Sequence, residues 1–145
     1  KQPMTPLTWP QARQIIDAAF ASAREHQFRP MGIVVVDCAA QTVASAREDG
    51  ASALRLDIAL GKAAAAVGMG VNSRGLVQRA KELPAFFSAV ATVAGQKFVP
   101  QTGAVLITDS AGNVLGAAGA SGGTGDEDEK IVLAAIAAAG LSSRD

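Results

Sequence analysis

Residues 32–38 have the sequence GIVVVDC, and this run decides the fold. An unbroken series of β-branched side chains is typical of a strand that is covered on both faces. A short turn at residues 39–41 follows, and residues 42–47, TVASAR, are expected to form a second strand. The two strands are therefore predicted to pair as a hairpin.

A second hairpin is predicted further along the chain. Residues 103–108, GAVLIT, and residues 113–118, NVLGAA, are apolar runs. Asp109 and Gly112 lie between them and suit a tight turn. The sheet is therefore expected to contain at least four antiparallel strands.

Helices are expected around these hairpins. Thr8 and Gln11 have the spacing of a capping box, and apolar residues then recur at intervals of three and four as far as Ala23, which predicts a helix ending near His26. The remaining helices are predicted at residues 52–67, 73–81, 84–92 and 126–139. The order predicts an α+β fold in which helices flank a central antiparallel sheet, as one domain over residues 1–145.

Charge and hydropathy restrict the possible partners. Thirteen basic and thirteen acidic residues give a formal net charge of zero. We expect no binding to nucleic acid or to a membrane surface, because both depend on excess positive charge. No segment is long and apolar enough to be expected to span a bilayer. Residues 1–4 contain no apolar region of a signal peptide, which predicts a cytoplasmic protein. An export signal cleaved before Lys1 is an open alternative.

Small residues dominate the composition. Alanine and glycine together make up 46 of 145 residues, and the aromatic residues are five Phe and one Trp. Each buried alanine removes little apolar area from water, so the core of one subunit is expected to be thin. We therefore expect a homo-oligomer that buries further helix surface between subunits.

The sequence excludes several kinds of catalytic or metal site. Cys38 and His26 each occur once, so no disulfide framework or cysteine zinc cluster can form within the chain, and no metal site is predicted. His26 is expected to stabilise a helix end as a cation, with metal or haem ligation as the alternative. No G-x-S-x-G nucleophile motif occurs.

A glycine-rich segment at residues 116–125, GAAGASGGTG, lies between a predicted strand and a predicted helix. Backbone amides in this setting bind phosphate in other proteins. No lysine follows the glycines here, and Asp126 to Glu129 already complement the helix dipole. The segment is expected to cap the helix and allow close packing, or to bind a small polar ligand through Ser121 and free amides.

Three charged residues are candidates for a site. Arg55 and Lys62 are seven residues apart and fall on the same side of the predicted helix, about 20° apart. This basic stripe suits a carboxylate ligand, and the alternative is a solvated face. Asp49 follows Arg47 and Glu48 at the end of a strand, as an acid/base group or as part of a surface charge network.

The ordered motifs IVVVD (33–37), REDGA (47–51), DIALGKA (57–63) and VLGAAGASGGT (114–124) resemble the GlcG/HbpS family. That family comprises small haem-binding or haem-degrading domains, which also occur as the C-terminal part of PduO-type proteins. The resemblance implies a profilin-like α/β/α fold, self-association and a setting among catabolic genes. Haem ligation differs among members, so no ligand position is transferred. The sequence departs from the family at residues 100–103, PQTG, where members carry more glycines.

The resemblance also marks site positions at the end of the second strand, on the second long helix and before the last helix. These positions are Asp49, Gly50, Lys62, Gly119, Ser121, Gly122, Gly123, Asp128 and Glu129. Together with Arg55, we expect Lys62, Gly119, Ser121, Gly122, Gly123 and Asp128 to bind the ligand, and Lys62 and the Ser121 segment to line one cavity.

Three functions follow as hypotheses. The first is an oligomeric binding module for a small carboxylate or hydroxy acid, held by Lys62 and the amides of residues 121–123, or for haem. The second is an enzyme in which Lys62 or Asp49 transfers protons and those amides stabilise an oxyanion. The third is an interaction domain. Haem is not favoured as a cofactor, because tyrosine is absent and His26 lies among charged neighbours.

Overall fold

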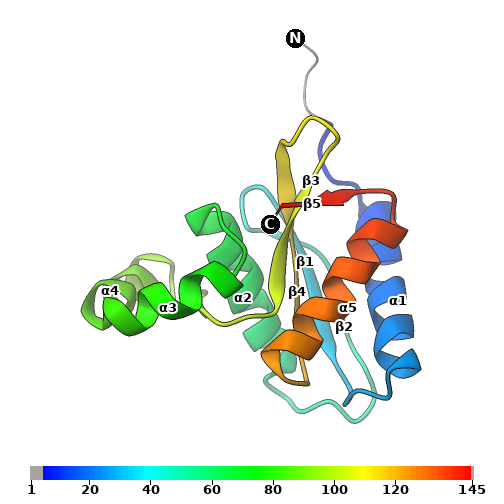
Figure 1. The fold of residues 1–145 in the computed structure, drawn as a ribbon, viewed down its shortest axis with the longest axis horizontal. Helices are drawn as coiled ribbons and strands as arrows, with labels where there is room; N and C mark the ends of the chain where they lie inside the picture. The colour runs from blue at the N-terminus through cyan, green and yellow to red at the C-terminus, as the bar shows by residue number, and fades with distance from the viewer. Residues whose placement is uncertain (1–4, 145) are drawn as a thin grey trace.

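The computed structural model describes residues 5–144 and contains five helices and five strands within them (Figure 1). The helices are α1 (Trp9–Glu25), α2 (Arg55–Met69), α3 (Arg74–Glu82), α4 (Pro84–Val93) and α5 (Gly125–Ala138). The strands are β1 (Gly32–Asp37), β2 (Thr42–Arg47), β3 (Ala104–Thr108), β4 (Val114–Ser121) and β5 (Ser142–Ser143). Residues 1–4, on which the expected absence of a signal peptide rests, lie outside the described residues.

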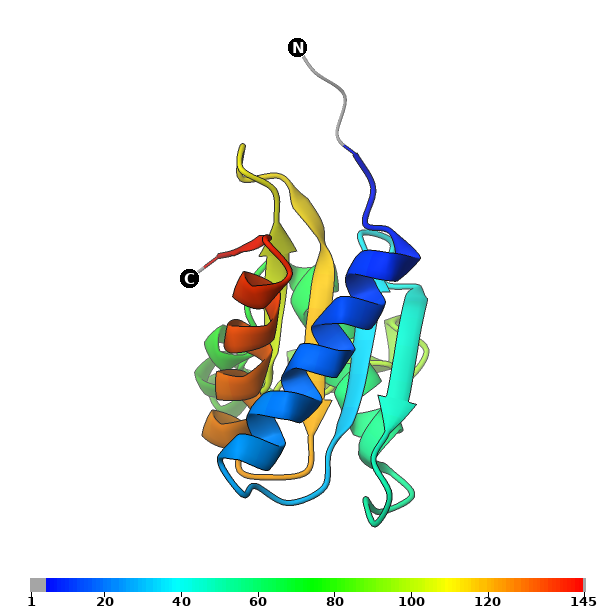
Figure 2. The same cartoon turned by 90° about the vertical axis from the view of Figure 1, so that its right-hand side faces the viewer.

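The strands form one antiparallel sheet in the order β2-β1-β4-β3-β5. Helices α1 and α5 lie side by side on one face of this sheet, and α2 packs on the other face (Figure 2). This arrangement confirms the predicted α+β class and the profilin-like α/β/α architecture. No helix in the described part of the chain is long and apolar enough to cross a membrane.

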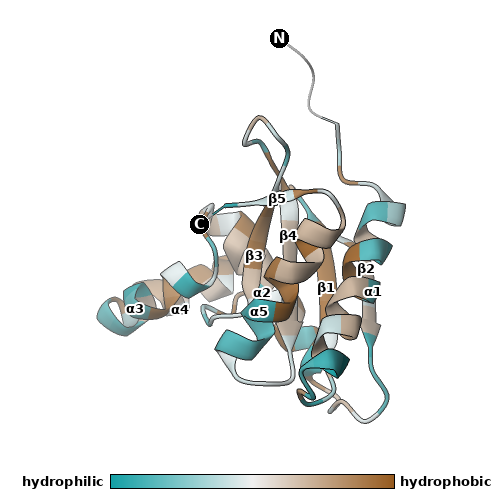
Figure 3. Ribbon diagram, turned by 45° about the vertical axis from the view of Figure 1, so that its right-hand side comes forward, coloured by the Kyte–Doolittle hydropathy of each residue, from teal (hydrophilic) through white to brown (hydrophobic). Residues whose placement is uncertain are grey.

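Strand β1 contributes to two apolar layers, as its sequence predicted. Ile33 and Val35 pack with α1 and α5, whereas Val34 and Val36 pack with α2. Successive side chains of a strand point to opposite faces, so an uninterrupted apolar run is buried on both sides. In Figure 3 the central strands are accordingly hydrophobic, and hydrophilic residues gather at the outer ends of the helices.

Strand β4 is longer than the sequence analysis predicted. It continues through Gly119 and Ala120 to Ser121, because this whole segment pairs with β1, with Gly32 opposite Ser121. The expectation of a loop over residues 119–121 was therefore wrong. The residues are small because α2 lies very close: a Cβ atom on Gly119 would be 2.5 Å from the carbonyl oxygen of Ala59.

The capping box predicted at the start of α1 is present, the start of α5 has a second one that was not predicted, and α2 begins later than expected. Thr8 and Thr124 each form a capping box, with Gln11 and with Glu127. Helix α2, expected to start near Ser52, begins at Arg55. Helices α3 and α4 project from the body of the molecule as an arm (Figure 1).

Candidate functional site

A cavity of about 420 Å³ lies at the end of α2 that faces the start of α5. Its wall combines the first half of α2, the end of β4, the turn into α5, one residue of α3, and the segment that leads from the arm to β3. The lining residues are Arg55, Ile58, Lys62, Val77, Val99, Gln101, Thr102, Ser121, Gly123, Thr124, Gly125, Asp126 and Asp128. Lys62 and Ser121 therefore line one cavity, as predicted.

A buried ion pair forms the deepest charged part of this wall. Lys62 Nζ on α2 lies 3.0 Å from Asp128 Oδ2 on α5, and donates a second hydrogen bond of 3.0 Å to the carbonyl oxygen of Ala120. Lys62 is 5% exposed and Asp128 is 1% exposed. The alternative of a solvated face therefore does not apply to Lys62.

The backbone is shaped to hold the lysine. A Cβ atom on Gly103 would be only 2.6 Å from Lys62 Nζ, and the φ angle of Gly103 is +140°, which side chains rarely adopt. Glycine at this position thus lets the start of β3 approach the ammonium group directly.

Asp128 connects three parts of the site. Its Oδ1 accepts a 2.9 Å hydrogen bond from the backbone N–H of Gly123, while its Oδ2 faces Lys62. Burial raises the pKa of Asp128, although Lys62 and the Gly123 N–H both act in the opposite direction. The Gly123 amide is thus committed to Asp128, which corrects the expectation that this amide is free to bind a ligand.

Arg55 is the second cation that α2 contributes to the wall. Its Nη1 donates a 3.1 Å hydrogen bond to Ser121 Oγ, and its side chain is partly buried. Within residues 5–144, Arg55 forms no ion pair with an acidic side chain, whereas Lys62 is paired with Asp128. Ser121 is 1% exposed, so the hydroxyl and the guanidinium are held together at the cavity wall.

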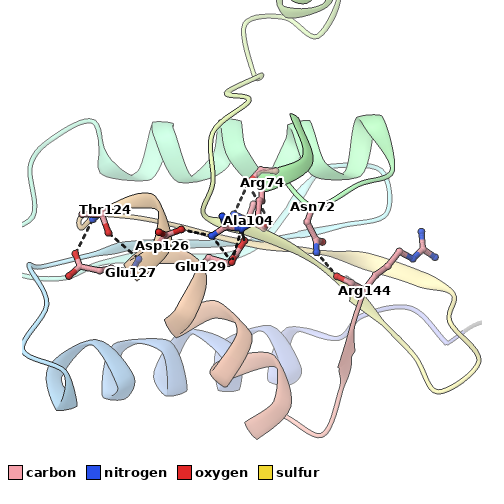
Figure 4. A network of polar contacts seen from close by, with 9 residues as sticks. Asn72, Arg74, Ala104, Thr124, Asp126, Glu127, Glu129 and Arg144 are labelled. Atoms are coloured by element: carbon pink, nitrogen blue, oxygen red, sulfur yellow. Dashed lines mark hydrogen bonds and ion pairs between the residues drawn. The ribbon is translucent and has the colours of Figure 1, made fainter. Parts of the chain in front are cut away.

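The other acidic residue of the wall, Asp126, is neutralised from outside the cavity. Arg74 at the start of α3 contacts both Asp126 and Glu129 on α5 (Figure 4). Hydrogen bonds from Arg74 to Glu129 and to Asp126 raise the pKa of the arginine. Sequence analysis did not identify Arg74, because nothing in the local sequence indicates that α3 approaches α5.

Some of the expected site residues do not line this cavity. Gly119 packs beneath Ala59, and Gly122 packs against Pro30 and Met31. Asp49 lines a separate surface cavity of about 430 Å³ with Arg24, Arg47 and Glu48 among others. The structure thus brings together Arg55, Lys62, Ser121, Gly123 and Asp128 from the expected set, and places Gly119, Gly122 and Asp49 elsewhere.

Apolar and neutral polar residues complete the wall. Ile58, Val77 and Val99 provide an apolar side, and Gln101 and Thr102 provide amide and hydroxyl groups. Their contribution was not predicted, since they come from three different elements. Gly61 is the one residue whose sequence position could have indicated part of this wall. A glycine in the middle of a helix suggests a close contact, and a Cβ atom on Gly61 would lie 2.5 Å from Val99.

The side chains that commonly bind metals lie elsewhere. His26 caps the C-terminal end of α1, with Nδ1 2.8 Å from the carbonyl oxygen of Ser22, and is exposed. Cys38 is exposed in the turn after β1. Among the described residues, no group of three His, Cys, Asp or Glu side chains is arranged to hold a metal ion.

Comparison with solved structures gives strong matches to this fold. The PduOC–haem complex superposes with a TM-score of 0.85 at 24% identity, over 97% of this chain and 100% of that chain. A Klebsiella pneumoniae protein, ORFY, gives a TM-score of 0.79 at 23% identity, over 97% and 94%. At these identities both matches establish the fold alone.

Three further comparisons bear on the family. A double mutant of HbpS from Streptomyces reticuli matches with a TM-score of 0.79 at 26% identity, over 94% of this chain and 89% of that chain. Comparison with curated proteins found no significant match. A family model described as "haem degrading protein HbpS-like" matches residues 7–137. Because this match spans nearly the whole chain, the protein belongs to the HbpS-like family.

Proposed function

We propose that the cavity binds a small organic acid, either a simple carboxylate or a hydroxy acid. The observation that carries this proposal is Arg55, a partly buried guanidinium that contacts buried Ser121 and has no acidic partner in the described part of the chain. The catabolic setting implied by the family resemblance and the cytoplasmic location expected from the sequence belong to the same proposal.

The charges around the cavity support an anionic ligand. Asp128 is paired with Lys62, and Asp126 shares Arg74 with Glu129. Arg55 has no ion-pair partner among the described residues, although its charge also acts on the Asp128 carboxylate. A carboxylate beside Arg55 gains charge-assisted hydrogen bonds, which are stronger than those between neutral groups.

The neutral part of the wall fits the remainder of such a ligand. Ser121 Oγ accepts its hydrogen bond from Arg55, which leaves the serine proton available for a ligand oxygen. Ile58, Val77 and Val99 offer apolar contact to a short carbon chain, and Thr102 can bind a ligand hydroxyl. The cavity volume of about 420 Å³ lies within the range of small-molecule sites.

Isothermal titration calorimetry tests this proposal with propionate, lactate and glycolate, and with propionamide as a neutral control. We expect the acids to bind and Arg55→Gln to weaken binding by about 10- to 100-fold, the effect of losing one charge-assisted hydrogen bond. The matched control is Arg13→Gln, an exposed arginine on α1. Equal binding by Arg55→Gln and the unaltered protein, or no binding of any acid, would contradict the proposal.

Haem is a second candidate ligand, because PduOC, which shares this fold, was solved as a haem complex. The residues of this cavity do not supply an axial ligand of the usual kinds. Met31 is fully buried in the core, and His26 and Cys38 are exposed at other places. Titration with haemin decides between the candidates: a saturable site with a Soret band, lost in His26→Ala, would favour haem over an organic acid.

We also propose that the protein forms homo-oligomers through the arm. Residues 83–96 contain no charged side chain, and within them Leu83, Phe86 and Val93 are 54%, 55% and 89% exposed. A second copy is the partner that fits, because two uncharged helix faces can associate without desolvating charge and the net charge of zero gives no repulsion. Light scattering should give a mass well above 14.6 kDa, reduced by Phe86→Glu. A monomer at micromolar concentration would contradict this proposal.

A further inference from the structure

The binding of an organic acid by Arg55 leaves one reactive group of the cavity without a role. Lys62 is a primary amine in the wall, shielded from water and paired with a single carboxylate, Asp128. A lysine amine in such surroundings is a nucleophile toward carbonyl compounds once it has lost its proton.

The ion pair provides a route for that proton. Asp128 Oδ2 is 3.0 Å from Lys62 Nζ, which is the distance of a direct hydrogen bond. Transfer of one proton along this bond converts two buried charges into two neutral groups, and burial favours neutral groups. The raised pKa of Asp128 is consistent with a carboxylate that accepts a proton more readily than usual.

We propose that Lys62 Nζ forms an imine with the carbonyl carbon of a small 2-oxo acid or carboxylated aldehyde whose carboxylate is bound by Arg55 and Ser121. This inference rests on the proposed function, since it uses the same anion-binding groups. It narrows the ligand class from organic acids in general to acids that carry a carbonyl group next to the carboxylate.

The two anchoring groups lie at neighbouring points of β4. Arg55 Nη1 contacts Ser121 Oγ at 3.1 Å, and Lys62 Nζ contacts the carbonyl oxygen of Ala120 at 3.0 Å. A 2-oxo acid has its carboxylate and its carbonyl carbon directly bonded. Two adjacent residues of one strand therefore place the cation for the carboxylate and the amine for the carbonyl within reach of one small molecule.

The reaction balances with the groups present. The Lys62 ammonium gives a proton to the Asp128 carboxylate, and the free amine attacks the carbonyl carbon. The resulting carbinolamine oxygen takes one proton back from Asp128 and one from the attacking nitrogen, and the C–O bond breaks with release of water. The product is a protonated imine on Lys62 next to an Asp128 carboxylate, so the pair of opposite charges that existed before the reaction is restored. No oxidant, reductant or metal takes part.

Reductive trapping tests the proposal. The protein is incubated with glyoxylate or pyruvate, treated with sodium cyanoborohydride, and analysed by intact mass and peptide mapping. We expect one adduct per chain, located at Lys62, with labelling at least about 10-fold above that of each exposed lysine, because Asp128 accepts the proton of the Lys62 ammonium. Lys81, Lys97 and Lys130 are exposed and serve as internal controls. Excess lactate, which has no ketone or aldehyde group and cannot form an imine, should protect Lys62.

Variants separate the chemistry from folding and from simple binding. Lys62→Arg keeps a cation for Asp128 but has no nucleophilic amine, so circular dichroism should be unchanged and the adduct lost. Asp128→Asn should slow trapping by about 10-fold or more. Labelling spread evenly over the lysines in the folded protein would overturn this inference. If lactate still binds calorimetrically in that case, the proposed binding function stands; if it does not, both fail.

Discussion

Replacement of Lys62 by Met tests whether the pair with Asp128 is a buried interaction that the fold depends on. Methionine has a similar length but no charge, so the substitution leaves Asp128, which is 1% exposed, without its cation. Removal of one partner from a buried ion pair costs about 3–5 kcal/mol of unfolding free energy. The hydrogen bond from the Gly123 N–H remains and places the expected loss near the lower end of that range.

The loss of unfolding free energy is expected to depend on pH. The direction of this dependence follows from the pKa of Asp128. Burial already raises that pKa in the folded protein above the ordinary value of 3.8, and the loss of Lys62 removes an opposing effect, so the pKa rises further. The folded state then binds the proton more tightly than the unfolded state. Stability is therefore highest in acid and falls as the pH rises through the folded pKa, by up to about 1.4 kcal/mol per pH unit.

Urea unfolding at pH 5, 6, 7 and 8 measures this effect, since the midpoint and slope give the unfolding free energy. We expect the unfolding free energy of Lys62→Met to fall furthest below that of the unaltered protein at pH 8. The double variant Lys62→Met/Asp128→Asn should recover stability and lose the pH dependence. Lys130→Met, an exposed lysine on α5, is the matched control and should change stability little. A loss of unfolding free energy below about 1 kcal/mol that is the same at all four pH values would be the size expected for a surface ion pair. That result would refute the argument for a buried pair.

Three further predictions concern the scaffold. Gly119→Ala should destabilise the protein by about 1–3 kcal/mol, because the new methyl group would lie 2.5 Å from the Ala59 carbonyl oxygen; an unchanged urea midpoint would contradict the close packing. Thr124→Ala should cost about 1 kcal/mol of unfolding free energy through loss of the α5 capping box, and an unchanged melting temperature would show that the cap is unimportant. Asp109 accepts hydrogen bonds from Asn113, which lower its pKa, so its contribution to stability is present at neutral pH and lost as the pH falls through that lowered pKa. The stability difference between the unaltered protein and Asp109→Asn should therefore shrink in acid, and a difference that grows in acid would reverse the assignment.

The two cations of α2, Arg55 and Lys62, illustrate how far the local sequence predicts the lining of the cavity. The helical period placed Arg55 and Lys62 on the same side of α2, and both side chains reach adjacent residues of β4. Their different roles could not be predicted from that period. Lys62 is neutralised by a residue 66 positions away in the sequence, whereas Arg55 is not. The choice depends on which acidic side chain the packing of α5 brings near each cation.

The sequence by itself determined the class of fold and the approximate positions of the five helices and of β1 to β4, because the signals for these features are local. The apolar run in β1 indicated a strand buried on both faces, and the capping box of Thr8 and Gln11 marked the start of α1. Tertiary structure alone decided that β4 continues to Ser121, that the Gly123 amide is taken by Asp128, and that Asp49 lies outside the cavity. These outcomes depend on pairing and packing between segments that are far apart in the chain. The final arrangement of α2, β4 and α5 sets the partner of each group, and no pattern within a single segment indicates it.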